Sequence, residues 1–197
     1  MDKNLSAVIK QRIERTVEAL NANGFDAHYI EDTEALMAKI ADYLPQGGSW
    51  SVGGSVTLFE TGVIDHLKTG DYVYYDRYAK NADVDDVFAK AKGSDAYFMS
   101  SNAITENGEL YNVDGRGNRL SAMIHGPKKV VVIAGYNKIV KNLDDAHKRV
   151  DEIAAPANCV RLNIADVDSV CSFELVSRRQ SVKNRIAVLI LPESYGY

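Results

Sequence analysis

Two polar, glycine-containing segments carry most of the residues whose types and spacing could support chemistry. The first runs from Ser51 to Glu60, and its two glycines directly follow a short apolar stretch. Glycines at the end of a strand let backbone N–H groups turn outward and remove the Cβ that would block a ligand. A capped helix toward Leu67 would add unpaired N–H donors that favour an anion. A plain tight turn before a capped helix explains the pattern equally well. The residues expected to bind a ligand are Gly53, Gly54, Ser55, Thr57 and Glu60.

The second segment runs from Thr105 to Arg119. Its Asn107-Gly108 pair predicts a two-residue hairpin turn that joins strands at residues 103–105 and 110–112. Two carboxylates and two arginines lie within a short distance along this segment, and together they could bind or polarise a polar substrate. These are Glu106, Asp114, Arg116 and Arg119. The alternative is a hairpin and loop that are held together by Asn and Asp side chains.

The roles expected at the second segment differ between its residues. We expect Glu106 to act as acid, base or nucleophile, and Arg119 to pair with a substrate carboxylate. Lys138 follows the most apolar strand, so it is placed either for ligand contact at the sheet edge or at the start of a helix. The other expected ligand-binding residues are Asn112, Asp114, Gly115, Gly117 and Asn118.

These segments need a scaffold, and the hydrophobic pattern predicts an α/β fold with one mainly parallel sheet flanked by helices. Strands are expected at residues 25–30, 49–52, 72–75, 96–99, 129–134 and 185–191. Helices are expected at residues 3–23, 33–44, 84–92 and 143–153, with Pro156 closing the last. No repeat or linker interrupts residues 1–197, so we expect a single domain.

Composition narrows the class of partner. The 197 residues carry a formal net charge of −4, which argues against nucleic acid. Neither a signal peptide nor an apolar run of membrane-spanning length is visible, so we expect no membrane and a cytoplasmic location. Cys159 and Cys171 lie twelve positions apart, which suits neither a disulfide framework nor a metal site. A tyrosine cluster at Tyr74, Tyr75 and Tyr78 could line a cleft or the interface of a homodimer.

Several long motifs, in order along the chain, resemble the LUD-domain family of lactate-utilisation proteins. They are Gly53–Gly62, Asn102–Gly108, Asn112–Arg119, Gly126–Val130, Asn137–Val140, Ala154–Asn158 and Tyr195–Tyr197. The resemblance implies the fold of glucosamine-6-phosphate deaminase, ribose-5-phosphate isomerase, CoA transferases and 5-formyltetrahydrofolate cyclo-ligase. It implies that the Gly53–Thr57 loop holds a phosphate or acyl group. It also implies that Glu106 stands where CoA transferases carry their nucleophile, because residues 105–108 are similar to that loop.

The same resemblance implies an accessory component of lactate, or hydroxy-acid, utilisation that binds a small anionic metabolite beside iron–sulfur partner proteins. The alternative is a stand-alone enzyme, similar to the cyclo-ligase or a CoA transferase, that acts on a phosphorylated, folate or acyl substrate. Relatives of this length carry a cysteine-rich stretch after the Ala154–Asn158 motif, whereas this chain has only Cys159 and Cys171 there. We therefore expect no metal at this position, and the sequence names no cofactor.

Overall fold

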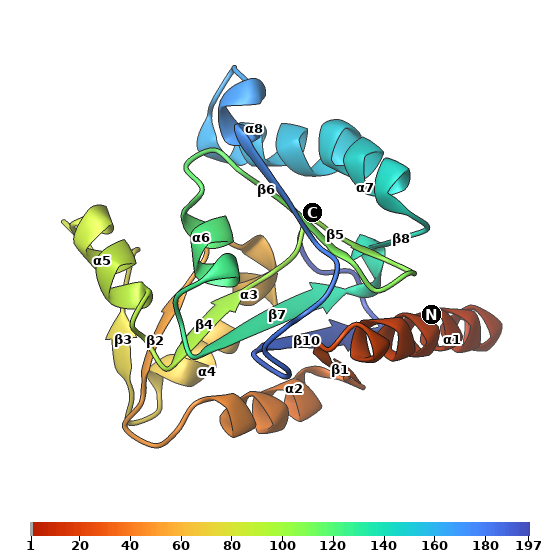
Figure 1. Cartoon of the computed structure of the whole chain (residues 1–197), viewed down its shortest axis with the longest axis horizontal. Coiled ribbons are helices and arrows are strands. Elements are labelled where there is room, and N and C mark those ends of the chain that lie inside the picture. Colours follow the sequence, from red (N-terminus) through yellow and green to blue (C-terminus); the bar gives the residue numbers. More distant parts are fainter. Residues whose placement is uncertain (1) are drawn as a thin grey trace.

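The computed structural model describes residues 2–197, and its centre is a six-stranded parallel sheet (Figure 1). The strand order is β1-β10-β7-β4-β2-β3, and every neighbouring pair is parallel. The strands are β1 (Asp26–Tyr29), β2 (Ser49–Val52), β3 (Val73–Tyr75), β4 (Ala96–Met99), β7 (Lys129–Gly135) and β10 (Ile186–Leu191). The expectation of a mainly parallel α/β fold is confirmed.

Helices cover both faces of this sheet because its central strands are apolar on both sides. In β7, Val130 and Val132 pack into one hydrophobic cluster, whereas Val131 and Ile133 pack into the other. Each buried side chain of this size stabilises the fold by roughly 1.5–3 kcal/mol. The first face is covered by α1 (Lys3–Ala22), α5 (Val84–Ala91) and α6 (Asn118–Ile124). The second is covered by α2 (Thr33–Ile40), η1 (Ala41–Tyr43), α3 (Val56–Glu60) and α4 (Val63–Lys68).

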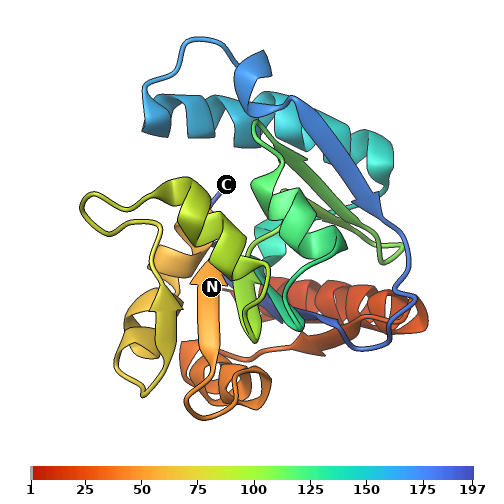
Figure 2. The ribbon, with the colours of Figure 1, turned by 60° about the vertical axis from the view of Figure 1, so that its left-hand side comes forward.

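A second, four-stranded sheet lies beside the first, in the order β8-β5-β6-β9. The predicted hairpin forms β5 (Ala103–Thr105) and β6 (Leu110–Asp114), while β8 (Ile139–Val140) and β9 (Phe173–Ser177) flank it. A long helical segment lies across this sheet (Figure 2). It consists of α7 (Leu143–Arg149), a π-helical turn η3 (Val150–Ala154) and α8 (Ala155–Leu162). Two short turns, η2 (Tyr136–Lys138) and η4 (Asp168–Val170), complete the structure.

The structure corrects two predicted helix ends. The helix expected to stop before Pro156 continues to Leu162, with Pro156 in the first turn of α8. A proline is tolerated there because the π turn has already changed the hydrogen-bond register, and an N–H is not required at a first turn. The helix expected to run from Ser55 to Leu67 divides into α3 and α4 because Gly62 adopts a left-handed conformation, with φ of 74°.

Three neighbouring strands of the large sheet end at the same edge. β2 is followed by Gly53 and β4 by Ser100, and β7 is followed by the η2 turn, which ends at Lys138. Ligands of open parallel sheets bind at the carboxyl edge of the strands, so this is where a site is expected. None of the helices within residues 2–197 combines the length and apolar character needed to cross a membrane.

Candidate functional site

A cavity of about 340 Å³ lies at the carboxyl edge of β2, β4 and β7. The loop after β2 and the segments after β4 and β6 form much of its wall, and α8 lines another part. The structure therefore brings the two predicted segments together. Lining residues that sequence analysis expected in the site are Gly54, Ser55, Thr57, Asp114, Gly115, Asn118, Arg119 and Lys138.

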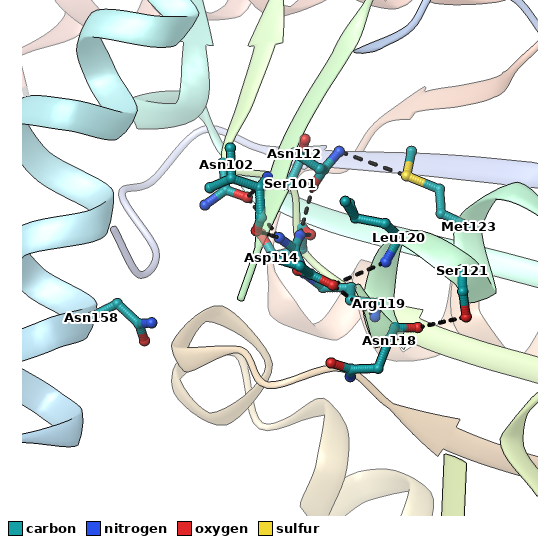
Figure 3. A network of polar contacts seen from close by, with 12 residues as sticks. Ser101, Asn102, Asn112, Asp114, Asn118, Arg119, Leu120, Ser121, Met123 and Asn158 are labelled. Carbon is teal, nitrogen blue, oxygen red and sulfur yellow. Dashed lines mark hydrogen bonds and ion pairs between the residues drawn. The ribbon is translucent and has the colours of Figure 1, made fainter. Parts of the chain in front are cut away.

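Arg119 is the centre of the polar network in the cavity wall (Figure 3). Its Nε donates to Asp114 Oδ1 at 2.9 Å. Its Nη1 donates to the main-chain oxygen of Ser100 at 3.0 Å and to Asn112 Oδ1 at 2.6 Å. Its Nη2 donates to Asn102 Oδ1 at 2.7 Å and to the main-chain oxygen of Val113 at 2.6 Å. A guanidinium has five N–H donors, and these five hydrogen bonds to the protein use all of them.

Asp114 holds the start of α6 against this arginine. Its Oδ2 accepts hydrogen bonds from the backbone N–H groups of Arg119, at 2.8 Å, and Leu120, at 3.1 Å. The Asp114 and Arg119 side chains are only 9% and 11% exposed, so their ion pair is shielded from water. Arg119 therefore fixes the geometry of the wall and contributes positive charge to it. Pairing with a substrate carboxylate, the role expected from the sequence, would require Arg119 to give up one of these bonds.

The two glycines of the first loop each accommodate an arginine. A Cβ on Gly53 would lie 3.0 Å from Arg119 Cδ and 3.4 Å from Tyr97 Oη. A Cβ on Gly54 would lie 3.6 Å from Arg77 Nη1. Gly53 itself does not line the cavity, but its missing side chain lets the first loop pack directly on Arg119. The loop beside it is fixed by Ser55, whose Oγ accepts from Leu58 N–H at 3.4 Å.

Lys138 is almost fully buried, with 3% of its surface exposed, and lines the cavity from the η2 turn. Its Nζ donates to the main-chain oxygen of Tyr197 at 2.8 Å. Burial, together with the nearby cations Arg149 and Arg119, lowers the pKa of Lys138 to about 7, while Glu60 acts in the opposite direction.

Three further arginines line the cavity, and two of them were not singled out from the sequence. Arg77 follows β3 and lies over the rings of Tyr78 and Phe88, at 5.5 and 5.2 Å from the ring centroids. Arg161 projects from α8 and donates from Nε to Tyr197 Oη at 2.7 Å. Arg116, which belongs to the predicted segment, forms an exposed ion pair with Asp85 at 2.9 Å.

Residues 195–197 cross the edge of the first loop. Thr57 Oγ1 donates to the main-chain oxygen of Tyr195 at 3.2 Å, and the N–H of Gly196 donates to Glu60 Oε2 at 2.6 Å. Asn137 Nδ2 donates to the main-chain oxygen of Gly196 at 3.0 Å. Glu60 does not line the cavity itself, so the structure gives it a role in holding this segment.

Glu106 lies away from the cavity. Its carboxylate pairs with Arg12 of α1 at 2.8 Å and with Lys141 at 3.2 Å. The hairpin explains this position: β5 and β6 are antiparallel, so their turn lies at the opposite end from Asn102 and Asp114, which line the cavity. Burial would raise the pKa of Glu106, but the hydrogen bonds from Arg12 and Lys141 outweigh it and hold that pKa below its usual range. The structure thus does not bring this predicted nucleophile to the site.

The remaining predicted residues surround the cavity without all lining it. Asn112 is fully buried behind the wall, between Arg119 and Met123 Sδ, which its Nδ2 approaches at 3.6 Å. Gly117 begins α6 with φ of 72° and borders a second cavity of about 310 Å³ between α5 and α6. Asn118 lines both cavities. In Figure 3, Asn158 of α8 faces the Arg119 network from across the site.

Both cysteines lie close to the site as free thiols. Cys171 is half-buried and lines the cavity, and Cys159 is buried in α8. Burial raises the pKa of the Cys171 thiol, and nearby acidic groups and Cys159 add to that effect. Across residues 2–197, no group of three or more His, Cys, Asp or Glu side chains is arranged to hold a metal ion.

The comparisons with known proteins agree with this architecture. The structure is similar to a crystal structure of a DUF162 family protein from Deinococcus radiodurans, with a TM-score of 0.54 and 15% sequence identity. That match covers 95% of this chain and 98% of the other, and at this identity it concerns the fold alone. No curated protein matches the chain. The family model described as the LUD domain matches residues 13–191, which is nearly the whole sequence. The chain therefore belongs to the LUD domain family.

Proposed function

We propose that this protein binds a small carboxylated or phosphorylated metabolite in the cavity at the carboxyl edge of β2, β4 and β7. The charge of the wall carries the proposal. Five basic side chains line the cavity against one acidic side chain, Asp114, although the whole chain has a net charge of −4. The basic residues are Arg77, Arg116, Arg119, Lys138 and Arg161. A concave site with one sign of charge concentrates ligands of the opposite sign.

Free hydrogen-bonding capacity supports an anion at this position. Within residues 2–197, no carboxylate forms an ion pair with Arg77 or with Arg161. Arg161 uses its Nε and one Nη2 donor on Tyr197 and Asn158, which leaves other N–H groups of its guanidinium free. The buried Oγ of Ser100, another residue of the wall, has no hydrogen-bond partner among the described residues. Buried polar groups are normally satisfied, so a ligand oxygen would complete this wall.

In the cell, we assign the protein to lactate or hydroxy-acid utilisation, as an accessory component that works beside iron–sulfur partner proteins. This assignment rests on membership of the LUD domain family together with the basic side chains of the cavity wall. Affinity purification of the full chain from its native cells, grown with and without lactate, tests it. Recovery of iron–sulfur proteins on lactate supports the role, and recovery of none under either condition contradicts it.

The alternative is a stand-alone enzyme similar to the cyclo-ligase or a CoA transferase, and the CoA-transferase form of it requires a carboxylate nucleophile in the cavity. Asp114 is the one side-chain carboxylate in the described part of the wall, and it is held by Arg119 and two backbone N–H groups. Glu106 is paired with Arg12 and Lys141 at the far end of the hairpin. The geometry therefore favours anion binding over covalent carboxylate catalysis.

Thermal unfolding in the presence of candidate anions tests the binding proposal directly. A ligand at 100 times its Kd stabilises the folded protein by about 2.7 kcal/mol, which gives a measurable rise in Tm. We expect such a rise with lactate, pyruvate, phosphate or a sugar phosphate. Loss of a charge-assisted hydrogen bond in Arg77→Met or Arg161→Met should weaken binding about tenfold or more. The control Arg179→Met removes an exposed arginine outside the cavity and should bind normally.

A further inference from the structure

The second cavity, between α5 and α6, adjoins the anion-binding cavity. Arg116 and Asn118 line both of them, so the two spaces share a boundary. The first has a volume of about 340 Å³ and the second about 310 Å³. Pockets of roughly 300–1,000 Å³ typically enclose ligands much larger than a three-carbon acid. The pair of cavities therefore suits a ligand with two parts, one in each.

The two cavities differ in charge. The first is lined by five basic side chains and one acidic side chain, as described above. In the second, Asp85 and Arg116 pair with each other at 2.9 Å. Lys92, which is exposed, is the other charged residue of that wall in the described part of the chain. An ionised group is therefore attracted to the first cavity, whereas the second suits an uncharged group.

Each cavity also has a buried hydroxyl group without a hydrogen-bond partner. Tyr97 of β4 lines the second cavity and is only 1% exposed, and its Oη has no partner among residues 2–197. A Cβ on Gly53 would lie 3.4 Å from that oxygen, so the hydroxyl lies beside the loop after β2. Ser100 Oγ is in the same situation in the first cavity. Because buried hydroxyls are normally hydrogen-bonded, both indicate a polar partner that the protein does not supply.

The second cavity offers a stacking surface and a free amide. The guanidinium carbons of Arg77 and Arg116 lie 5.2 and 6.0 Å from the centroid of the Phe88 ring, which lines this cavity. Planar heteroaromatic rings stack on aromatic side chains and on guanidinium planes alike. Asn118 bonds to Ser121 Oγ through its main-chain oxygen, at 3.2 Å, which leaves its side-chain amide as donor and acceptor for a ring edge (Figure 3). These features favour a heteroaromatic ring over an aliphatic chain.

We propose that the two cavities bind one ligand, a phosphate ester that carries a planar heteroaromatic ring. The phosphate lies in the first cavity against Arg77 and Arg161, and the ring lies in the second against Phe88. The Tyr97 hydroxyl bonds to a nitrogen or oxygen of the ring edge. A phosphate ester of this kind carries about two negative charges at neutral pH, which suits several arginines better than a single carboxylate does. This inference rests on the proposed anion-binding function, and it names the ligand class of that site.

Calorimetric titration of the full chain with three probes tests the inference. Adenosine monophosphate has both parts, ribose 5-phosphate has the phosphate without the ring, and adenosine has the ring without the phosphate. We expect adenosine monophosphate to bind about tenfold or more tightly than ribose 5-phosphate, because one stacked base contributes at least that factor. Adenosine should also bind more weakly than its monophosphate. Equal affinities for the monophosphate and for either part would overturn the inference.

Variants of the second cavity should affect only the ligand that carries the ring. Tyr97→Phe and Phe88→Leu should each lower the affinity for adenosine monophosphate about fivefold and leave that for ribose 5-phosphate unchanged. Arg161→Met should weaken both phosphates alike. Tyr43→Phe is the matched control for Tyr97→Phe, because it also removes a buried hydroxyl without a partner, but outside both cavities. Melting curves show that each variant is folded. The inference requires the selective loss in both cavity variants, and its absence from either would overturn it.

The same probes distinguish failure of this inference from failure of the proposed function. Binding of ribose 5-phosphate with no advantage for adenosine monophosphate would leave anion binding intact and refute the role of the second cavity. Absence of binding by both phosphates would also refute this inference. It would refute the proposed function as well if lactate and pyruvate likewise failed to raise Tm.

Discussion

Gly53 lies directly against Arg119, so that a Cβ at this position would stand 3.0 Å from Cδ of the arginine. The arginine cannot easily retreat because all five N–H donors of its guanidinium are engaged. The loop after β2 and the segment after β6 therefore depend on each other for their position. This contact is the physical link between the two segments that the sequence marks as candidate sites.

Gly53→Ala should destabilise the protein by about 1–3 kcal/mol, the usual cost of overpacking a tight contact. It should also weaken anion binding because the wall is displaced. Gly54→Ala is the matched control, since its Cβ would meet only the guanidinium of Arg77, at 3.6 Å, which is ordinary van der Waals contact. Urea unfolding of both variants measures the difference. Equal stabilities would show that Arg119 yields to the added methyl group.

Arg119→Lys should destabilise the fold by about 3–5 kcal/mol, because a lysine cannot replace the planar fork and leaves Asp114 buried with fewer partners. Arg116→Lys serves as the control, since its ion pair with Asp85 is exposed and should contribute no more than about 1 kcal/mol. Chemical denaturation of the two variants provides the comparison. Similar small losses in both would contradict the structural role of the Arg119 network.

Glu106→Gln should leave anion binding unchanged, because the carboxylate lies outside the cavity. It should reduce stability by about 0.5–1 kcal/mol through loss of the pairs with Arg12 and Lys141. Calorimetric titration with the anion that gives the largest Tm shift decides between a structural and a catalytic role. A large loss of binding or turnover in this variant would restore Glu106 as a reactive residue.

Lys138 should make stability depend on pH above neutrality. Its folded pKa is about 7, whereas a lysine in an unfolded chain titrates near 10.4. Between these values the unfolded chain binds more protons, so the destabilisation that is complete below pH 7 is lost as the pH rises. The slope contributed by Lys138 is on the order of 1 kcal/mol per pH unit. Lys138→Met should lack this slope, and parallel pH profiles for the two proteins would refute the assignment.

The large sheet could be predicted because its strands are continuous apolar runs. β7 and β10 are buried on both faces, so each reads as a strand without any knowledge of its neighbours. The small sheet was only partly predictable. Its hairpin carries the local Asn107-Gly108 signal, whereas β8 has two residues and β9 pairs with β6 across a long separation in sequence. Neither flanking strand has a local pattern that distinguishes it from a loop.

In the site, too, the residues that could be predicted are those marked by a local sequence pattern. The residues that were missed depend on how distant segments of the chain pack together. Gly54 and Lys138 were found because residues that follow buried strands meet at one sheet edge, and Asp114 was found because charged residues gather in its segment. Arg77 follows β3 in the same way and could have been found by that rule. Arg161 could not, because its position depends on how α8 crosses the small sheet. Glu106 was wrongly predicted to lie in the site because its turn resembles a catalytic loop in sequence. The turn lies at the end of the hairpin that faces α1, away from the cavity.

The π turn between α7 and α8 has a consequence for how tolerant this region is to length changes. A π turn accommodates one additional residue within a continuing helix, and each residue of a helix rotates the following side chains by about 100°. Asn158 and Arg161 line the cavity in the helical register set by that turn. Deletion of a single residue from Val150–Ala154 would therefore leave a regular helix but redirect both side chains. Substitutions preserve the direction in which α8 faces, whereas insertions and deletions change it.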